Sequence, residues 1–435
     1  MTTGAEAVSP RPPRRFGLGA LALGPGLVYI LSSVGPSDLV SGSIAGATYG
    51  YSLLWLLAAG MVARYVIVGA TARYVMVSGE SLIGGYGRIS RWVVGLWFLV
   101  AVVKRHTSVL AKLLLLGAAA HLVLPLPTRH SAAIWGLSSW TLGFVLMFRG
   151  RYRLIEKLSK PLGVVMGSCL AATALFSRPD PVELVRGALT PVLPVAQGLY
   201  SPTLVLMAVL SAATASFGNL KYSANLHEKG WRDLSFLSIQ RRELLVSMCG
   251  MFCMLASIQV AAAGALQPHG IQIGSVEDLI PIFGGIFGRG GRIILGVTLW
   301  CMVFSDYLGD GASYGVMFSD AYYRFVRKSP DASRQKAGEM PAYRWVVLFL
   351  FVSPLYALLT DWTPIGLVLV KSALNLAALP VVTLPVLRLT ADRHIMGDHA
   401  NGWFTNSVLV LTTISAFYFG YQGVVELVNG IRDSR

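Results

Sequence analysis

Apolar residues in this chain gather into long runs that are separated by short polar and basic stretches. A helix that crosses the hydrocarbon core of a membrane needs about 20 mostly apolar residues, and eleven runs meet that need. They cover 21–47, 51–77, 93–124, 131–148, 154–177, 199–226, 243–267, 293–322, 342–359, 363–388 and 403–429. The pattern therefore predicts an all-α membrane protein with eleven spans.

Composition and charge are typical of a protein embedded in a lipid bilayer. Of the 435 residues, 54% are hydrophobic and 13% are charged, whereas soluble domains carry roughly 25% charged residues. The net charge of +15 does not indicate a nucleic-acid partner, because the basic residues lie mainly in the loops between spans. By the positive-inside rule these loops place the N-terminus in the cytoplasm and the C-terminus outside, and we expect a multi-pass protein of the plasma membrane.

The domain organisation follows from the spans. Residues 1–20 are expected to form a cytoplasmic tail, and 21–435 a single transmembrane transporter domain. No soluble domain fits between the spans, and no set of Ser, His and Asp converges on a water-accessible site. We therefore expect a transporter that is not an enzyme and needs no cofactor. The four cysteines all fall within spans and are interpreted as buried thiols, not as metal ligands.

Two spans are interrupted by residues that break or weaken a helix. Span 1 reads Gly-Pro-Ser-Asp from Gly35 to Asp38, and span 6 contains Ser216, Phe217, Gly218 and Asn219. In hydrocarbon, such an interruption persists only where the freed backbone groups face protein, a cavity or a ligand. The two interruptions occupy equivalent places, which predicts inverted repeats at 21–177 and 199–388, an extra helix at 403–429, and a substrate between the unwound segments. The alternative is a proline kink plus an ordinary polar packing face.

Basic side chains occur where apolar helices are expected. Span 3 contains Lys104, Arg105, His106 and Lys112, and span 10 contains Lys371 and Asn375. Ionisable groups at membrane depth are costly, and by default they mark a pathway for a substrate or ion. Two structural alternatives stay open. One is snorkelling of Lys104 and Arg105 toward water, and the other is an ion pair of Lys371 with an aspartate (Asp38, Asp306 or Asp310).

Three stretches carry a family resemblance. They are "GPGLVYILSSVGPSDLVSGSIAGATYGYSLLWLL" in span 1, "FRGRYRLIEKL" after span 4 and "ALPVVTLPVLRL" in span 10. Through them the chain resembles the NRAMP divalent-metal transporters over essentially its whole length. The resemblance implies a LeuT-like fold, in which two inverted five-helix repeats are followed by an extra helix, and a protein that works as a monomer.

The departures from that family lie at the two interruptions. Where the family has Asp-Pro-Gly-Asn in span 1, this chain has Gly35, Pro36, Ser37 and Asp38. Where the family has Met-Pro-His in span 6, it has Ser216, Phe217 and Gly218. The resemblance implies that the family's Asp and Met bind the metal, so this chain lacks both that carboxylate and the soft thioether that selects transition metals.

These departures favour a small inorganic anion as the substrate, since the N-terminal N–H groups of a half-helix suit an anion. The expected binding residues are Gly35, Ser37, Asp38, Ser216, Phe217, Gly218, Asn219, Lys371 and Asn375, and the expected pathway residues are Lys104, Arg105, His106 and Lys112. By analogy with an NRAMP-related branch, bicarbonate is the first candidate, carried by alternating access without proton coupling. The alternatives are a hard divalent cation such as magnesium, held partly hydrated by Asp38, Asn219 and carbonyls, and a transport-inactive scaffold or sensor.

Overall fold

The computed structural model consists of helices and connecting segments. It describes residues 34–148, 152–229, 231, 233–328 and 340–433, and no strand occurs among them. The tail expected at 1–20 and the first part of span 1 lie outside the described residues.

The described helices follow the order of the predicted spans. The first are α3 (Pro36–Tyr49), α4 (Leu54–Ser78), α5 (Leu82–Ile89), α6 (Arg91–Val123), α7 (Ser131–Phe148), α8 (Tyr152–Phe176) and α9 (Pro181–Leu189). They are followed by α10 (Pro202–Thr214), α11 (Gly218–Lys229), α12 (Leu237–Ala265), α13 (Ile280–Phe287), α14 (Gly291–Ala321), α15 (Pro341–Val352), α16 (Pro364–Ala377), α17 (Pro380–Ala391), α18 (Arg393–Met396) and α19 (Trp403–Asp433).

The all-α prediction is confirmed. Within the described ranges, eight helical segments are long and apolar enough to cross a membrane, and they correspond to spans 2, 3, 4, 6, 7, 8, 9 and 10. The other three expected spans contain α3, α8 and α19. Span 10 is divided into α16 and α17 near Pro380, which has no N–H to continue the first of them.

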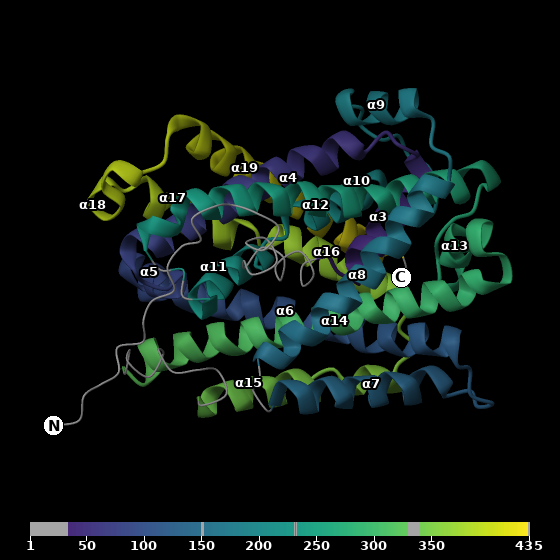
Figure 1. Ribbon diagram of the computed structural model, residues 1–435, viewed down its shortest axis with the longest axis horizontal. Helices are drawn as coiled ribbons and strands as arrows, with labels where there is room; N and C mark the ends of the chain where they lie inside the picture. Colours follow the sequence, from purple (N-terminus) through teal and green to yellow (C-terminus); the bar gives the residue numbers. More distant parts are fainter. Residues whose placement is uncertain (1–33, 149–151, 230, 232, 329–339, 434–435) are drawn as a thin grey trace.

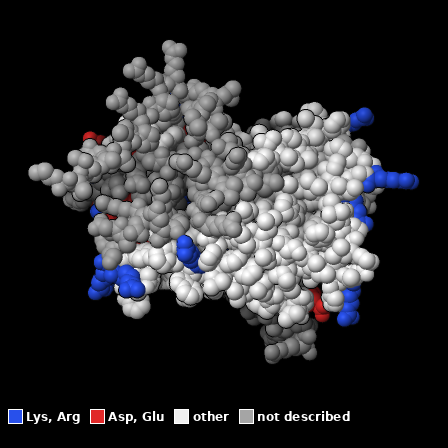
Figure 2. All heavy atoms as spheres, turned by 60° about the horizontal axis from the view of Figure 1, so that its bottom comes forward, with Lys and Arg blue, Asp and Glu red and all other residues white. Residues whose placement is uncertain are grey.

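Most of the helices run along one shared direction (Figure 1). Helices α6 and α14 pack against each other through the body, while α7 and α15 cover them on one outer side. The described part of the face in Figure 2 is largely without charged side chains, and its lysines and arginines lie mainly toward the left and right ends. This arrangement suits a bilayer that surrounds the middle of the molecule.

Span 6 is interrupted where the sequence predicts it, and in span 1 the described helix begins at the predicted break, while residues before position 34 lie outside the described range. Helix α3 begins at Pro36, where the missing N–H leaves no helical hydrogen bond unmade. In span 6, α10 ends at Thr214 and α11 begins at Gly218. Between them, Ala215 and Ser216 have φ angles of 48° and 23°, a region that side chains disfavour. The chain therefore turns at these two residues instead of continuing one helix.

Close packing on α12 fixes the position of α3. A Cβ atom added to Gly46 would collide with the backbone carbonyl of Gln259 and would lie 2.9 Å from the Cβ of Ala262. A Cβ atom added to Gly42 would lie 2.9 Å from a methyl carbon of Ile258. Only glycine allows the two helices to approach this closely, and the start of α3 at Pro36 is positioned by that contact.

We expect opposite effects from the same substitution at two helical glycines. Gly46→Ala pushes α3 away from α12 and destabilises the protein by about 1–3 kcal/mol, the usual effect of overpacking. Gly69→Ala in α4, where the nearest atom would be 3.7 Å from the new Cβ, leaves stability equal or raises it by up to about 1 kcal/mol through helix propensity. Thermal unfolding of the purified proteins in one detergent measures both. Equal stability of the two variants would contradict the close α3–α12 contact.

Candidate functional site

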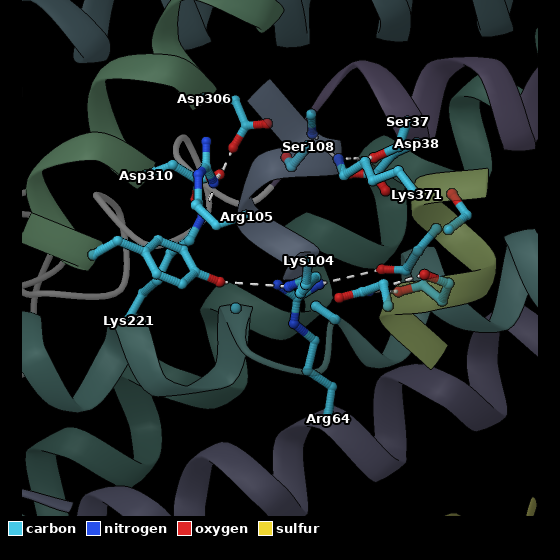
Figure 3. A pocket seen from close by; sticks show the side chains of 18 residues that line it. Ser37, Asp38, Arg64, Lys104, Arg105, Ser108, Lys221, Asp306, Asp310 and Lys371 are labelled. Carbon is cyan, nitrogen blue, oxygen red and sulfur yellow. Dashed lines mark hydrogen bonds and ion pairs between the residues drawn. The ribbon is translucent and has the colours of Figure 1, made fainter. Parts of the chain in front are cut away.

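A cavity of about 60 Å³ lies where the two interrupted spans meet. Its walls come from the start of α3, from α4, α6, α14 and α16, and from the turn between α10 and α11. Figure 3 shows the polar side chains that these helices direct toward it. Residues from distant parts of the chain therefore share one polar space inside a largely apolar bundle.

The start of α3 is held by its own aspartate. The N–H of Gly35 donates to Asp38 Oδ2 at 2.7 Å, so Asp38 caps the helix end. Next to it, Lys371 Nζ donates to Ser37 Oγ at 2.8 Å. Among the described residues no ion pair joins Asp38 or Lys371 to an opposite charge. The ion-pair alternative for Lys371 is therefore not what the structure contains.

Two aspartates of α14 form the acidic side of the cavity. Asp306 and Asp310 are four residues apart and so lie on one face of the helix. Lys112 Nζ lies 2.7 Å from Asp306 Oδ2 and 2.6 Å from Asp310 Oδ2. Asp310 also pairs with Arg105 and Lys221, and Lys221 Nζ lies 3.7 Å from Asp306 Oδ1. Each of these side chains is buried. Burying a single unpaired charge costs several kcal/mol, and the attraction between the opposite charges offsets that cost.

Basic groups outnumber acidic ones in the cavity wall. Three carboxylates line it, and the basic lining residues are Arg64, Lys104, Arg105, Lys221 and Lys371. Lys104 Nζ donates to the hydroxyl of Tyr314 at 3.4 Å and lies 5.1 Å from the ring centroid of Phe217. A buried ammonium gains from both contacts, since hydroxyl oxygen and ring face are negative.

Asp306 reaches the interruption of span 1. A Cβ atom built on Gly35 would lie 2.7 Å from Asp306 Oδ2. The carboxylate of Asp306 thus fills the space into which a side chain at position 35 would project. Because Asp38 Oδ2 also contacts the N–H of Gly35, two carboxylates from different helices meet at this glycine.

Eight of the thirteen expected site and pathway residues line the cavity. They are Gly35, Ser37, Asp38, Gly218, Lys371, Asn375, Lys104 and Arg105. Asn375 Nδ2 donates to Ser211 Oγ at 2.9 Å, while its buried Oδ1 has no hydrogen-bond partner. The structure therefore brings together residues of spans 1, 3, 6 and 10, as the interruptions and buried charges predict.

Three expected residues of span 6 lie outside the cavity lining. Ser216 is fully buried in the turn, and Phe217 packs its ring 6.2 Å from that of Trp97. Asn219 Nδ2 donates to the carbonyl of Thr214 at 2.8 Å, which satisfies an acceptor freed at the end of α10. The turn directs these side chains into packing and capping, and only Gly218 of the four faces the cavity.

Two expected pathway residues also lie elsewhere. His106 Nε2 is 3.0 Å from the hydroxyl of Tyr356 and does not line the cavity. Lys112 is not part of the lining and lies behind it, on the two aspartates of α14. For His106 the helical turn explains the difference, because it points about 100° away from its neighbour Arg105 around α6.

Sequence reasoning missed the central role of the α14 aspartates and the contribution of Lys221. Asp306 and Asp310 were expected only as possible partners of Lys371, although their spacing in an apolar span is itself a signal of a shared buried face. Within the described residues no group of three or more His, Cys, Asp or Glu side chains is arranged to hold a metal ion.

Comparison with known proteins extends the likeness over nearly the whole chain. A family model described as natural resistance-associated macrophage protein-like matches residues 26–426. The divalent metal cation transporter MntH of Aeromonas hydrophila is 23% identical over 412 residues, which are 91% of this chain and 93% of that protein. The protein of the same name from Ralstonia nicotianae is 26% identical over 399 residues, with 88% and 86% covered.

Solved structures share the fold. The manganese transporter of Eremococcus coleocola, in complex with an aromatic bis-isothiourea substituted compound, gives a TM-score of 0.76 at 15% identity and covers 97% of this chain and 90% of that chain. The nucleobase-cation-symport-1 family transporter MHP1 gives 0.58 at 11% identity, with 94% and 92% covered. The expected LeuT-like fold is confirmed.

The expectation of bicarbonate, or of another small inorganic anion, requires correction. The two MntH proteins, which align with most of this chain, are named for divalent metal cations, and the Eremococcus coleocola protein is named for manganese. None of these three names refers to an anion. With a family match that spans residues 26–426, the chain belongs to the Nramp family of membrane transporters.

Proposed function

We propose that this protein transports a hard divalent metal cation, such as Mg²⁺, through the cavity at the start of α3. The main support for the proposal is that the carboxylates of Asp38 and Asp306 both lie beside Gly35. Asp38 is only 7% exposed and has no ion pair with a described residue. A buried carboxylate in that position gains from a cation beside it.

The available ligands suit a hard cation better than a soft one. The cavity lining offers oxygen atoms from Asp38, Asp306 and Ser37, and Asn375, which also lines it, has a buried Oδ1 without a hydrogen-bond partner. Mg²⁺ is usually bound by one or two carboxylates and retains several waters, which fits a site with two acidic groups. No Met or Cys of the described chain lines the cavity, so nothing in the lining favours soft transition metals.

The basic residues are compatible with a cation because most of them are already engaged. Arg105 and Lys221 pair with Asp310, and Lys371 donates to Ser37. Their charge still lowers the affinity of the cavity for a dication. Transport requires binding that is strong enough for entry and weak enough for release, so a modest affinity is consistent with the proposed role. By family likeness we propose the plasma membrane as the location.

Flux through the purified protein in liposomes tests the proposal. We expect Mg²⁺ and Mn²⁺ uptake above that of empty liposomes, measured with dyes enclosed in the vesicles. Cd²⁺ should compete with Mg²⁺ no better than Mn²⁺ does, because the lining offers oxygen and no sulfur. Bicarbonate flux, followed as internal pH, should equal that of empty liposomes. Bicarbonate flux without any divalent-cation flux would overturn the proposal.

Substitutions at positions 35 and 306 test whether the carboxylate of Asp306 binds the cation beside Gly35. Asp306→Ala should weaken Mg²⁺ binding by about ten- to a hundredfold, the usual loss for a charge-assisted contact of about 1.5–3 kcal/mol. Gly35→Asp alone should also impair transport, because its side chain would collide with Asp306. The double variant removes the collision and returns a carboxylate, so it should bind Mg²⁺ better than either single variant.

A matched control comes from the same helix. Asp320 pairs with Arg324 at 2.6 Å and accepts from Ser81 Oγ at 2.6 Å, outside the cavity. Asp320→Ala should leave the Mg²⁺ affinity unchanged. If the double variant bound Mg²⁺ no better than Asp306→Ala, the carboxylate at Gly35 would have no part in the site.

A further inference from the structure

Lys112 makes an unusually complete set of contacts for a lysine inside a membrane protein. Its side chain is fully buried in α6. Its ammonium lies 2.7 Å from Asp306 Oδ2 and 2.6 Å from Asp310 Oδ2, and it donates to the backbone carbonyl of Asp306 at 3.3 Å. Two of these contacts are hydrogen bonds, to Asp310 Oδ2 and to the carbonyl of Asp306, and the contact with Asp306 Oδ2 is an ion pair. All three partners of the ammonium lie on α14.

One oxygen of Asp306 lies close both to Lys112 and to Gly35. Asp306 Oδ2, which Lys112 contacts, is also the atom that lies 2.7 Å from a Cβ built on Gly35. A cation bound between Asp38 and Asp306 would therefore bind an oxygen that already forms an ion pair with the Lys112 ammonium. Lys221 is a weaker competitor, since its Nζ is 3.7 Å from the other oxygen, Oδ1.

We propose that Lys112 acts as a built-in competitor for Asp306 and that this competition selects the valence of the transported cation. The proposal rests on the proposed function, because it assumes that a substrate cation uses Asp306. A monovalent ion such as Na⁺ carries the same charge as the ammonium and is not tethered, so it gains nothing by replacing it. A divalent ion attracts the carboxylate twice as strongly at equal distance, and it can take Oδ2 from the lysine.

Asp310 makes this exchange feasible. When Asp306 turns to a cation, Lys112 keeps its contact of 2.6 Å with Asp310, so no buried ammonium is left unpaired. Asp310 also pairs with Arg105 and Lys221, and these contacts keep it in place when Asp306 moves. In the cluster, Asp310 is therefore the fixed carboxylate, and Asp306 is the carboxylate for which the Lys112 ammonium and the substrate cation compete. Lys112 is a positioning residue in this account, because it acts on the substrate through Asp306.

Binding of Mg²⁺ and Na⁺ to the full chain in nanodiscs tests the inference, with choline chloride holding the ionic strength constant. Lys112→Met should raise the Mg²⁺ affinity about tenfold, the size of one charge-assisted contact. It should also allow Na⁺ to compete with Mg²⁺, which we do not expect for the unaltered protein. Lys112→Arg keeps the charge and should retain the selectivity against Na⁺. Lys112→Gln gives the same test as the methionine variant if that protein does not fold.

Arg105→Met is the matched control. Arg105 pairs with Asp310, and no ion pair joins it to Asp306 within the described chain. Both substitutions to methionine should lower the unfolding temperature, because each removes one partner of a buried pair. Arg105→Met should raise the Mg²⁺ affinity less than Lys112→Met does, because it removes a positive charge from the cavity wall but frees no oxygen of Asp306. Only Lys112→Met should allow Na⁺ to compete with Mg²⁺. An unchanged Mg²⁺ affinity and no Na⁺ competition in Lys112→Met and Lys112→Gln would overturn the inference while the proposed function stands. Absence of Mg²⁺ binding to the unaltered protein would instead overturn the proposed function.

Discussion

The ion-pair cluster on α14 is the interaction on which the centre of this protein depends. Two carboxylates buried in a membrane protein would be costly without opposite charges nearby. Lys112 and Arg105 from α6 and Lys221 from α11 supply those charges. Because these partners come from α6 and α11, the cluster ties both helices to α14 beside the interruption of span 6. The cavity and the position of Asp306 follow from that pairing.

The interruption of span 1 is the second element of the site. Gly35 has no side chain, and this absence gives room to the carboxylate of Asp306. Asp38 caps the new helix start and so remains fixed beside Gly35. The family resemblance places a metal-binding aspartate at the position of Gly35. In this chain the carboxylate of Asp306, from α14, lies beside Gly35 instead.

The sequence predicts the fold well and the site in part. Apolar runs of about 20 residues have one stable solution in a bilayer, so the spans could be found, and Gly-Pro and Ser-Phe-Gly mark the interruptions because they disfavour a continuous helix. Helical spacing shows that Asp306 and Asp310 share a face, but it does not show which helix they face. Ser216, Phe217 and Asn219 were expected in the cavity because the turn was located without its φ angles, which direct their side chains elsewhere. The expectation of an anion rests on the missing aspartate at position 35, and the sequence does not show that the carboxylate of Asp306 lies beside Gly35.

The central claim is that a divalent cation binds between Asp38 and Asp306. Anomalous X-ray diffraction from crystals grown with Mn²⁺ tests it directly, since the metal signal locates the ion without reference to the surrounding protein. We predict one strong peak about 2.0–2.6 Å from oxygen atoms of both carboxylates, the range for hard divalent ions. A peak that contacts neither carboxylate, or none in the cavity at saturating Mn²⁺, would contradict the account.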